Sequence, residues 1–302
     1  RGLGDVYKRQ VVVLDNPKKT LPSGWNVALR EYKGDAIIKV DAHAVIPEDF
    51  VSKNVRVLET GEYICGGQRP NIIDKPTPFK ETLLLAESSM FGSSIASYRN
   101  NPGKTYVKSL FHAAYRREVF EKVGFFNEEL VRTEDNEIHY RMRKAGYKLC
   151  FDPDIISYQY TRSSLKAMLK QKYANGYWIG KTSKVCPKCL SIYHFVPFAF
   201  VSAIIASGSV IGATGLAECI KKRHNHTLGK GISALRKVTV VLTTVMWVLY
   251  ALMASGMAAV SAFKAEDKRN ITNACLPVLF LLLHLSYGIG TIAGLMDKSK
   301  RG

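Results

Sequence analysis

The sequence predicts an α/β domain followed by a helical membrane region. Up to about residue 190, short β-branched runs alternate with amphipathic stretches, which is typical of α/β folds. Beyond it, the apolar segments 191–217, 238–263 and 274–296 are each long enough to cross a bilayer, which needs ~20 apolar residues. Lys and Arg number 43 against 25 acidic residues in 302, a formal charge of +18. Since no nucleic-acid motif is present, this charge favours an anionic membrane surface over nucleic acid.

The first elements follow from local patterns. We divide the chain into an unmatched segment 1–10, a globular domain 11–190 and a membrane region 191–302. Segment 1–10 has no pattern of a cleavable signal. Val11–Leu14 predicts a strand, Gly24–Tyr32 a helix with one apolar face, and the run that ends at Val40 a buried strand.

The next elements alternate in the same way. Pro47 and the acidic residues after it open a helix. Tyr63–Gln68 predicts a strand that leads into a glycine turn, where backbone can approach a ligand closely. Phe79–Phe91 suits an amphipathic helix, and we expect 92–108 to be a mobile loop.

The second half of the domain contains two further strand–helix pairs. A strand from Phe111 runs into a helix that Gly124 ends. Thr133 can cap the helix that begins at Glu134. Tyr147–Phe151 predicts a strand that Pro153 breaks, and a helix follows from Ser163 through Trp178. Six scattered cysteines show no disulfide framework, and Cys186 and Cys189 lack a second ligand pair for zinc, so we expect free thiols on a reducing side.

Topology in the membrane region is the least determined feature. The basic loop 221–237 and the basic tail from Lys298 would both be cytoplasmic by the positive-inside rule. A spanning segment 191–217 would instead place that loop outside. We therefore expect 191–217 to be re-entrant or interfacial, interrupted at 206–209.

Asp41 and His43 are the first candidate functional residues. They follow the strand that ends at Val40, and residues two apart in an extended chain point to the same side. Ligands bind at the carboxyl ends of strands in open α/β sheets. Carboxylate and imidazole groups can both bind a divalent cation, which a nucleoside diphosphate needs. Alone, the pair is a weak signal, because such a pair more often belongs to a turn that carries two solvated polar residues.

Three motifs in a row give a family resemblance. Asn16–Lys19, Gly24–Leu29 and Gly34–His43 together resemble the core of family 2 glycosyltransferases, and the Asp-Ala-His variant is most similar to the succinoglycan and exopolysaccharide biosynthesis branch. The resemblance covers residues 11–190 and implies the GT-A fold, a mixed sheet flanked by helices. Family members begin with a strand, a helix and a second strand ending in an acidic turn that reads the nucleotide. We expect this N-terminal part to be missing from the chain.

The resemblance also implies roles for residues. The family's Glu-Asp motif falls on Glu134 and Asp135, and its Asp supplies the catalytic base. From the residues alone, these acids would simply complement the dipole at a helix start. The metal would be Mg²⁺ or Mn²⁺ at Asp41 and His43. We assign substrate binding to Asp41, Glu134, Gln171 and Trp178, although membrane packing equally explains the aromatic residues of that last segment.

Taken together, the sequence predicts an inverting glycosyltransferase of the hexosyltransferase class. It would move a sugar from a nucleotide-diphosphate donor to a polyprenyl-diphosphate-linked saccharide in exopolysaccharide biosynthesis. We expect it in the inner membrane, multi-pass and in contact with lipids, with its catalytic domain cytoplasmic. A polyprenyl-phosphate sugar transferase is a related alternative. A non-catalytic membrane scaffold is another, because we expect the N-terminal part to be missing and because Lys108 stands where the family usually has an acid.

Overall fold

A mixed sheet of five strands forms the centre of the globular part, with the order β1-β6-β3-β7-β5. The computed structural model describes residues 11–92, 103–223, 229–265 and 269–298. Strands β3 and β7 are parallel, whereas β1–β6, β3–β6 and β5–β7 are antiparallel. The five strands are β1 (Ala36–Ile38), β3 (Ile64–Gln68), β5 (Thr105–Val107), β6 (Ala113–Arg116) and β7 (Leu149–Ile156). A smaller sheet combines β2 (Ala44–Val45), β8 (Tyr158–Tyr160) and β4 (Asn71–Ile72) in that order.

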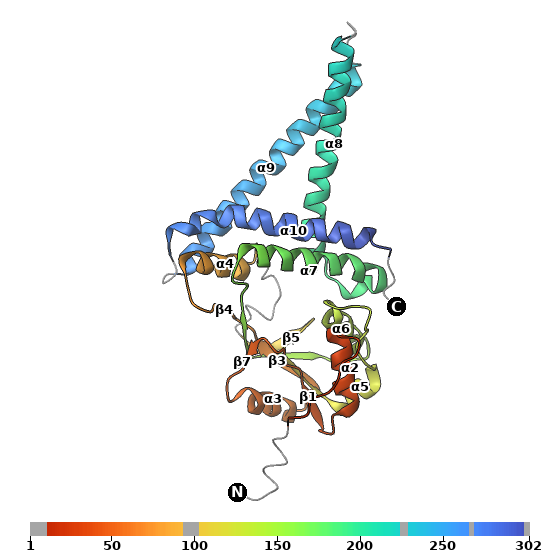
Figure 1. Cartoon of the computed structure of the whole chain (residues 1–302), viewed down its shortest axis with the longest axis vertical. Coiled ribbons are helices and arrows are strands. Elements are labelled where there is room, and N and C mark those ends of the chain that lie inside the picture. The colour runs from red at the N-terminus through yellow and green to blue at the C-terminus, as the bar shows by residue number, and fades with distance from the viewer. Residues whose placement is uncertain (1–10, 93–102, 224–228, 266–268, 299–302) are drawn as a thin grey trace, which may run out of the picture.

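Helices cover both faces of the large sheet, as the sequence predicted (Figure 1). The helices of this part are α2 (Leu21–Glu31), α3 (Phe50–Glu59), α4 (Pro78–Ser88), α5 (Arg117–Val123), α6 (Glu134–Lys144) and α7 (Leu165–Val185). Phe50 and Val57 of α3 pack with Cys65 and Cys150 on one face. The larger core brings α2, α5 and α6 against the other face and includes the buried ring of Tyr115. The sheet is thus buried on both sides, which explains its β-branched and apolar strands.

Three local predictions were wrong for identifiable reasons. Val11–Leu14 is irregular rather than a strand, and Val11 is 91% exposed. Gly66 and Gly67 lie inside β3, where a side chain on Gly67 would collide with the Ile155 carbonyl oxygen. These glycines therefore permit close strand packing, not ligand approach. Pro153 does not end β7, whose pairing with β3 shifts register instead. Residues 93–102 of the expected loop lie outside the described part of the chain.

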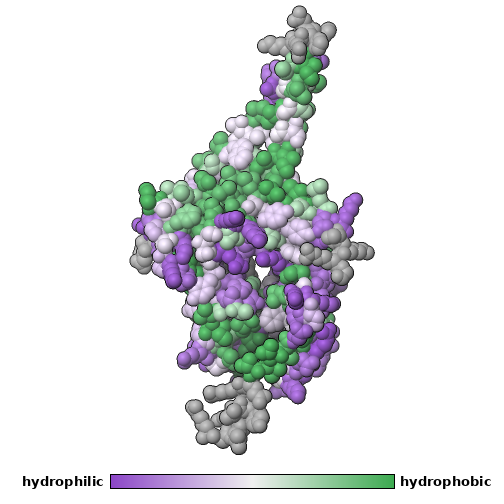
Figure 2. Space-filling model, viewed as in Figure 1, coloured by the Kyte–Doolittle hydropathy of each residue, from purple (hydrophilic) through white to green (hydrophobic). Residues whose placement is uncertain are grey.

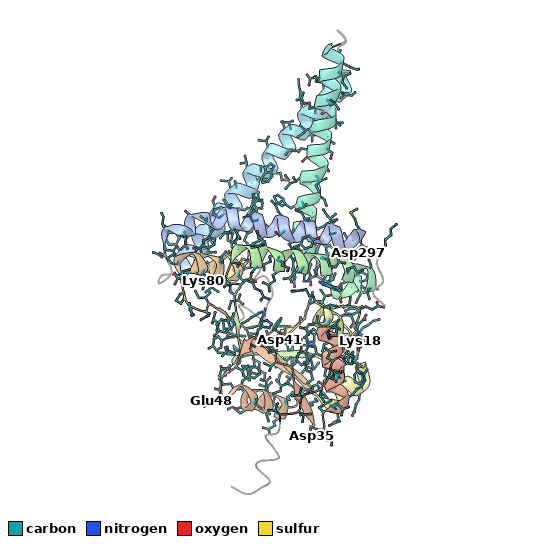
Figure 3. The ribbon with its side chains drawn as sticks, viewed as in Figure 1. Lys18, Asp35, Asp41, Glu48, Lys80 and Asp297 are labelled. Carbon is teal, nitrogen blue, oxygen red and sulfur yellow. The ribbon has the colours of Figure 1, made fainter. Side chains whose placement is uncertain are left out.

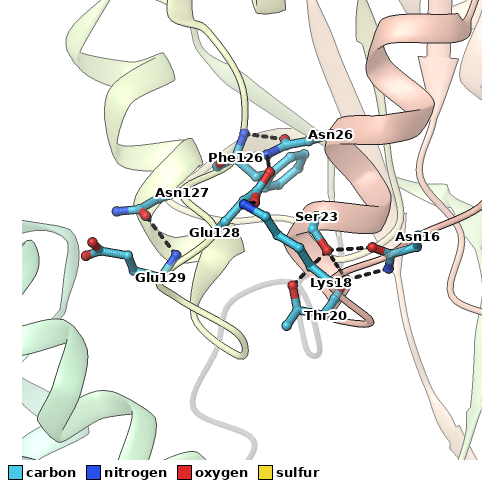
Figure 4. A network of polar contacts seen from close by, with 9 residues as sticks. All are labelled: Asn16, Lys18, Thr20, Ser23, Asn26, Phe126, Asn127, Glu128 and Glu129. Carbon is cyan, nitrogen blue, oxygen red and sulfur yellow. Dashed lines mark hydrogen bonds and ion pairs between the residues drawn. The ribbon is translucent and has the colours of Figure 1, made fainter. Parts of the chain in front are cut away.

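Asn26 of α2 fixes the segment that leads into α6 (Figure 4). Its side-chain amide donates to the Phe126 carbonyl oxygen at 2.9 Å and accepts from the Phe126 N–H at 2.8 Å. The same amide nitrogen donates to Glu128 Oε1 at 2.9 Å, and Lys18 Nζ lies 2.7 Å from Glu128 Oε2. Two of the motifs that carried the resemblance therefore hold the loop that precedes the Glu-Asp pair.

Three helices in the last third are long and apolar enough to cross a membrane. They are α8 (Val196–Arg223), α9 (Lys230–Lys264) and α10 (Leu276–Met296), and the candidate spans run over Ile192–Lys221, Lys230–Lys264 and Ile271–Met296. Short 3₁₀ turns, η2 (Pro187–Cys189), η3 (Ile192–Phe195) and η5 (Ile271–Cys275), join these elements. Figure 2 shows hydrophobic side chains over the layer of α10 and over much of the helices above it.

The first of these helices corrects a prediction. We expected an interruption at 206–209, but α8 is one continuous helix through these residues. Small side chains alone do not break a helix, because Ser207 and Ser209 turn their hydroxyl groups back to carbonyl oxygens of the preceding turn. In Figure 1, α8 and α9 rise away from the globular part, whereas α10 lies across their base and along α7.

Candidate active site

Lys39 and Asp135 form a buried ion pair at the C-terminal end of strand β1. Lys39 directly follows β1 and is 4% exposed, and its Nζ lies 2.5 Å from Asp135 Oδ1 in the first turn of α6. The rings of Trp25, Phe111 and Phe126 surround the ammonium group, with centroids 5.4, 5.8 and 5.9 Å from Nζ. A buried ammonium group is tolerated only where an anion pairs with it, and aromatic faces add to its stabilisation.

Three carboxyl groups act electrostatically on this lysine. Burial disfavours the charged form of Lys39, but the carboxylates of Asp135, Glu134 and Asp41 outweigh burial, so that the net effect raises the lysine's pKa. The residue therefore stays an ammonium ion. It interacts electrostatically with Asp41, beyond the end of β1, and with the Glu-Asp pair at the start of α6, although these acids lie far apart in the sequence.

Asp41 lies on the side of the globular part that faces α7 (Figure 3). Its Oδ2 is 3.7 Å from His112 Nε2, and the other ring nitrogen of His112 lies 2.8 Å from Ser157 Oγ. Burial raises the pKa of Asp41, but His112 and Lys39 lower it by more, so the carboxylate is favoured. Asp41 Oδ1 is buried and has no hydrogen-bond partner among the described residues. An anion with one unused oxygen is suited to a ligand.

His43 occupies the turn between β1 and β2, and its side chain is exposed. Gln159 Nε2 donates a hydrogen bond to His43 Nε2 at 3.0 Å. Within the described ranges, no three His, Cys, Asp or Glu side chains are grouped closely enough to hold a metal ion by themselves. Mg²⁺ at phosphate-transfer sites is usually held by one or two carboxylates together with substrate phosphates and water. The unused oxygen of Asp41 fits that chemistry, and the assignment of His43 as a second donor stays a prediction.

Glu134 and Asp135 differ sharply in their surroundings. Glu134 is 3% exposed, and its Oε2 has no hydrogen-bond partner among the described residues. Burial, together with the neighbouring Asp135, raises the pKa of Glu134 to about 8. Near neutral pH the Glu134 carboxyl is therefore largely protonated, whereas Asp135 is held as the partner of Lys39. Adjacent acids thus have separate properties because successive helical residues point in different directions.

The predicted cap of α6 was wrong. The Thr133 hydroxyl makes no bond to the first turn but bonds to the Thr182 hydroxyl in α7. Arg132 also reaches α7, where its Nη1 donates to Asn175 Oδ1 at 3.1 Å. The segment before the Glu-Asp pair is therefore tied to α7 instead of capping its own helix.

A buried histidine of α6 connects this helix to the sheet. His139 is completely buried, with Nδ1 3.0 Å from Ser109 Oγ and Nε2 2.8 Å from Tyr115 Oη. Burial is the main cause that lowers the pKa of His139 to about 4, so the ring is neutral. These bonds fix α6 against β6 and hold Asp135 at the sheet edge.

The remaining predicted residues lie on or near α7. Gln171 is half-buried, and Trp178 is 8% exposed with its ring edge-on to Tyr177 at 5.8 Å. Their assignment to substrate binding stays a prediction. Lys108, at the position where an acid is usual, is exposed.

Sequence reasoning missed Lys39 and His112. A lysine inside the β-branched run before Asp41 was a usable signal, because a buried charge needs an opposite charge nearby. His112 gave no such signal. Its contact with Asp41 exists only because β6 pairs with β1, through bonds such as Lys39 N–H to the Ala113 carbonyl oxygen at 2.9 Å.

Comparison with known proteins agrees with this geometry. Residues 36–290 match the model of the family described as glycosyl transferase family group 2. The chain belongs to this family. The resemblance stated from the motifs and the expected mixed sheet with flanking helices are both confirmed.

Several curated proteins are similar in sequence to this chain. The succinoglycan biosynthesis protein ExoA of Rhizobium meliloti is 28% identical over 172 residues, which are 55% of this chain and 51% of that protein. A dolichyl N-acetyl-α-D-glucosaminyl phosphate 3-β-D-2,3-diacetamido-2,3-dideoxy-β-D-glucuronosyltransferase of Methanococcus voltae is 23% identical over 65% of this chain and 62% of its own length. The O-antigen chain rhamnosyltransferase WbaN of Salmonella anatum is 26% identical over 50% of this chain and 49% of its own. The chain thus spans between about half and three fifths of the length of these relatives.

Proposed function

We propose that this chain is an inverting glycosyltransferase that moves a sugar from a nucleotide-diphosphate donor to a lipid-linked saccharide acceptor. The observation that carries the proposal is the buried pairing of Asp135 with Lys39, close to Asp41. It gathers a positioned carboxylate and an acidic ligand-binding residue at one edge of the sheet, where α/β enzymes bind ligands. Family membership supports the same reaction class.

Asp135 is the proposed general base. It accepts the proton of the acceptor hydroxyl as that oxygen attacks the anomeric carbon of the donor sugar. A single displacement with one base inverts the anomeric configuration. Lys39 holds Asp135 in place, and the surrounding aromatic rings keep water from its ammonium group. The protonated Glu134 beside it donates a hydrogen bond to substrate.

Asp41 and His43 would hold the divalent cation, Mg²⁺ or Mn²⁺. When bound, the metal neutralises charge on the diphosphate leaving group. His112, whose Nε2 lies 3.7 Å from Asp41 Oδ2, helps to keep Asp41 oriented and anionic for metal binding. Gln171 and Trp178 of α7 contact the acceptor in this proposal, because α7 is tied to the Glu-Asp segment through Arg132.

The proposed acceptor is a polyprenyl-diphosphate-linked saccharide for an exopolysaccharide. The names of the relatives support it: one is a succinoglycan biosynthesis protein, and another is named for a lipid-phosphate-linked sugar. We place the protein in the inner membrane, with its globular domain in the cytoplasm. The three apolar helices support membrane association.

Transfer of radiolabelled sugar tests this proposal. Membranes that contain the protein would be supplied with a panel of nucleotide-diphosphate sugars and polyprenyl-linked acceptors. We expect label in a lipid-linked oligosaccharide, and none with Asp41→Ala. A lipid-linked monosaccharide as the product would favour the polyprenyl-phosphate transferase. Absence of transfer with every donor would favour the scaffold.

A further inference from the structure

We infer that α10 lies along the membrane surface on top of α7, so that only α8 and α9 cross the bilayer. The inference rests on the membrane association proposed above and goes beyond it. By length and composition alone α10 could cross, like the other two helices. Its contacts point to a different place.

Glycines allow α7 and α10 to touch along their backbones. A side chain on Gly176 of α7 would collide with the Tyr287 carbonyl oxygen of α10. In return, side chains on Gly290 and Gly294 would collide with carbonyl oxygens of Tyr173 and Tyr177. Small residues at matching positions let two helices approach this closely. The two helices run side by side in the same direction (Figure 1).

Polar contacts lock the ends of the two helices together. Tyr177 Oη bonds to the Asp297 carboxylate, and Lys181 Nζ lies 3.5 Å from the same oxygen. Lys184 Nζ donates to the Asp297 carbonyl oxygen at 2.9 Å. The end of α10 is therefore fixed at the end of α7. Helix α7 in turn contacts the globular part, where the Thr182 hydroxyl bonds to the Thr133 hydroxyl.

The charges of α7 exclude it from the hydrocarbon core. Lys166, Lys170, Lys181 and Lys184 lie along it, and charged side chains at the centre of a bilayer are rare because their transfer from water is unfavourable. Since α7 stays outside the core, α10, in backbone contact with it, stays at the interface.

The other two helices differ from α10 in burial and direction. Of the most apolar window, 39% is buried within the chain in α10, against 6% in both other spans. Helices α8 and α9 have 28 and 35 residues, or about 40 and 50 Å at 1.5 Å per residue, and leave the layer of α10 together (Figure 1). These lengths exceed the ~30 Å of a hydrocarbon core. Gly288 of α10 packs against the Pro197 carbonyl at the base of α8, so the two helices meet where α8 begins.

Two crossings put the connection between α8 and α9 on the side opposite to the globular domain. The positive-inside rule predicts the reverse, since this connection is basic. The helix contacts and the charge rule therefore predict opposite positions for Cys219, an exposed cysteine near the far end of α8.

Labelling with a membrane-impermeant maleimide in sealed vesicles of both orientations tests the inference. In the starting variant Cys186, Cys219 and Cys275, the cysteines that are not buried, are replaced. Each test variant then carries one accessible cysteine for labelling. We expect Lys33→Cys in the globular domain, Cys275 and Lys298→Cys to label from one side, and Cys219 from the other. Labelling of Lys298→Cys from the side of Cys219 would show that α10 crosses. Labelling of Cys219 from the globular side would show that α8 re-enters.

Spin-label depth gives a second measurement. Ile289 in α10 is 49% exposed and Leu252 in α9 is 65% exposed, so both accept a label. We expect Ile289→Cys at headgroup depth and Leu252→Cys near the bilayer centre. Equal central depth would overturn the inference. Recovery of the intact chain in the soluble fraction would instead contradict the proposed membrane association, and the inference with it.

Discussion

Lys39 and Asp135 face each other across 2.5 Å, although they lie far apart in the sequence, and both are largely shielded from water. The pair joins the strand that precedes Asp41 to the helix that begins with the Glu-Asp motif. Because side-chain exposure is 5% for Lys39 and 16% for Asp135, neither charge is well solvated. Removal of either partner leaves a buried charge uncompensated.

Lys39→Met tests the structural and the functional role of this pair together. We expect a loss of stability of about 3–5 kcal/mol, typical of breaking a buried ion pair, and a fall in kcat of about 10–100-fold with little change in KM for the donor. Thermal unfolding in detergent and sugar transfer would measure the two effects. Lys39→Arg should recover part of kcat. Equal kcat in Lys39→Met and the parent would contradict the positioning role.

Glu134→Gln tests the raised pKa of the buried carboxyl. The pKa of Glu134 is about 8 in the folded chain, above its ordinary value of 4.5, so its contribution to stability is present below about pH 4.5 and is lost as the pH rises through 8. Gln mimics the protonated form at every pH. We expect Glu134→Gln to unfold at a higher temperature than the parent at pH 8.5 and at nearly the same temperature at pH 5. A constant difference across this range would contradict the assignment.

Asn26→Ala tests the clamp on the loop before α6. The substitution leaves the buried N–H and carbonyl of Phe126 without their partner, so we expect a loss of about 2–4 kcal/mol in unfolding free energy. Asn127→Ala is the matched control, because Asn127 makes one local bond to the Glu129 N–H. Chemical denaturation measures both. Comparable losses in the two variants would show that the clamp is unimportant.

Much of the fold could be predicted because local patterns and tertiary structure agree. The helix from Glu134, the Gly124 helix end, with φ 81°, and the strand from Ile64 are confirmed. The strand predicted over Val11–Leu14 was wrong, because β-branched residues form a strand only where a partner strand is available for hydrogen bonding. The strand end predicted at Pro153 was also wrong, because irregular pairing between β7 and β3 accommodates the proline within the strand.

The site was predictable in part. Asp41 and Asp135 emerged from strand-end and helix-start patterns together with the resemblance, and their shared link to Lys39 agrees with one site. The role of His112 depends on which strand pairs with β1, which no local pattern encodes. The depth of α10 likewise depends on its contact with α7, because length and hydropathy alone do not distinguish a crossing helix from one bound at the surface.

Metal binding can be tested without turnover. We expect Mn²⁺, observed by its electron paramagnetic resonance signal, to bind in the presence of a nucleoside diphosphate and to be lost in Asp41→Ala. His43→Ala should weaken binding less, since its exposed ring supplies only a second donor. His112→Phe is a variant that removes the group behind Asp41 without removing a ligand. Unchanged Mn²⁺ binding in Asp41→Ala would contradict the proposed site.

Asp135→Asn tests the central claim most directly, with sugar transfer and donor binding measured separately on the full protein. The substitution keeps the shape of the side chain but removes the acceptor of the proton. We predict that donor affinity stays nearly intact while kcat falls by at least ~100-fold, the lower range for loss of a positioned base. Transfer by Asp135→Asn at the parent rate would contradict the account.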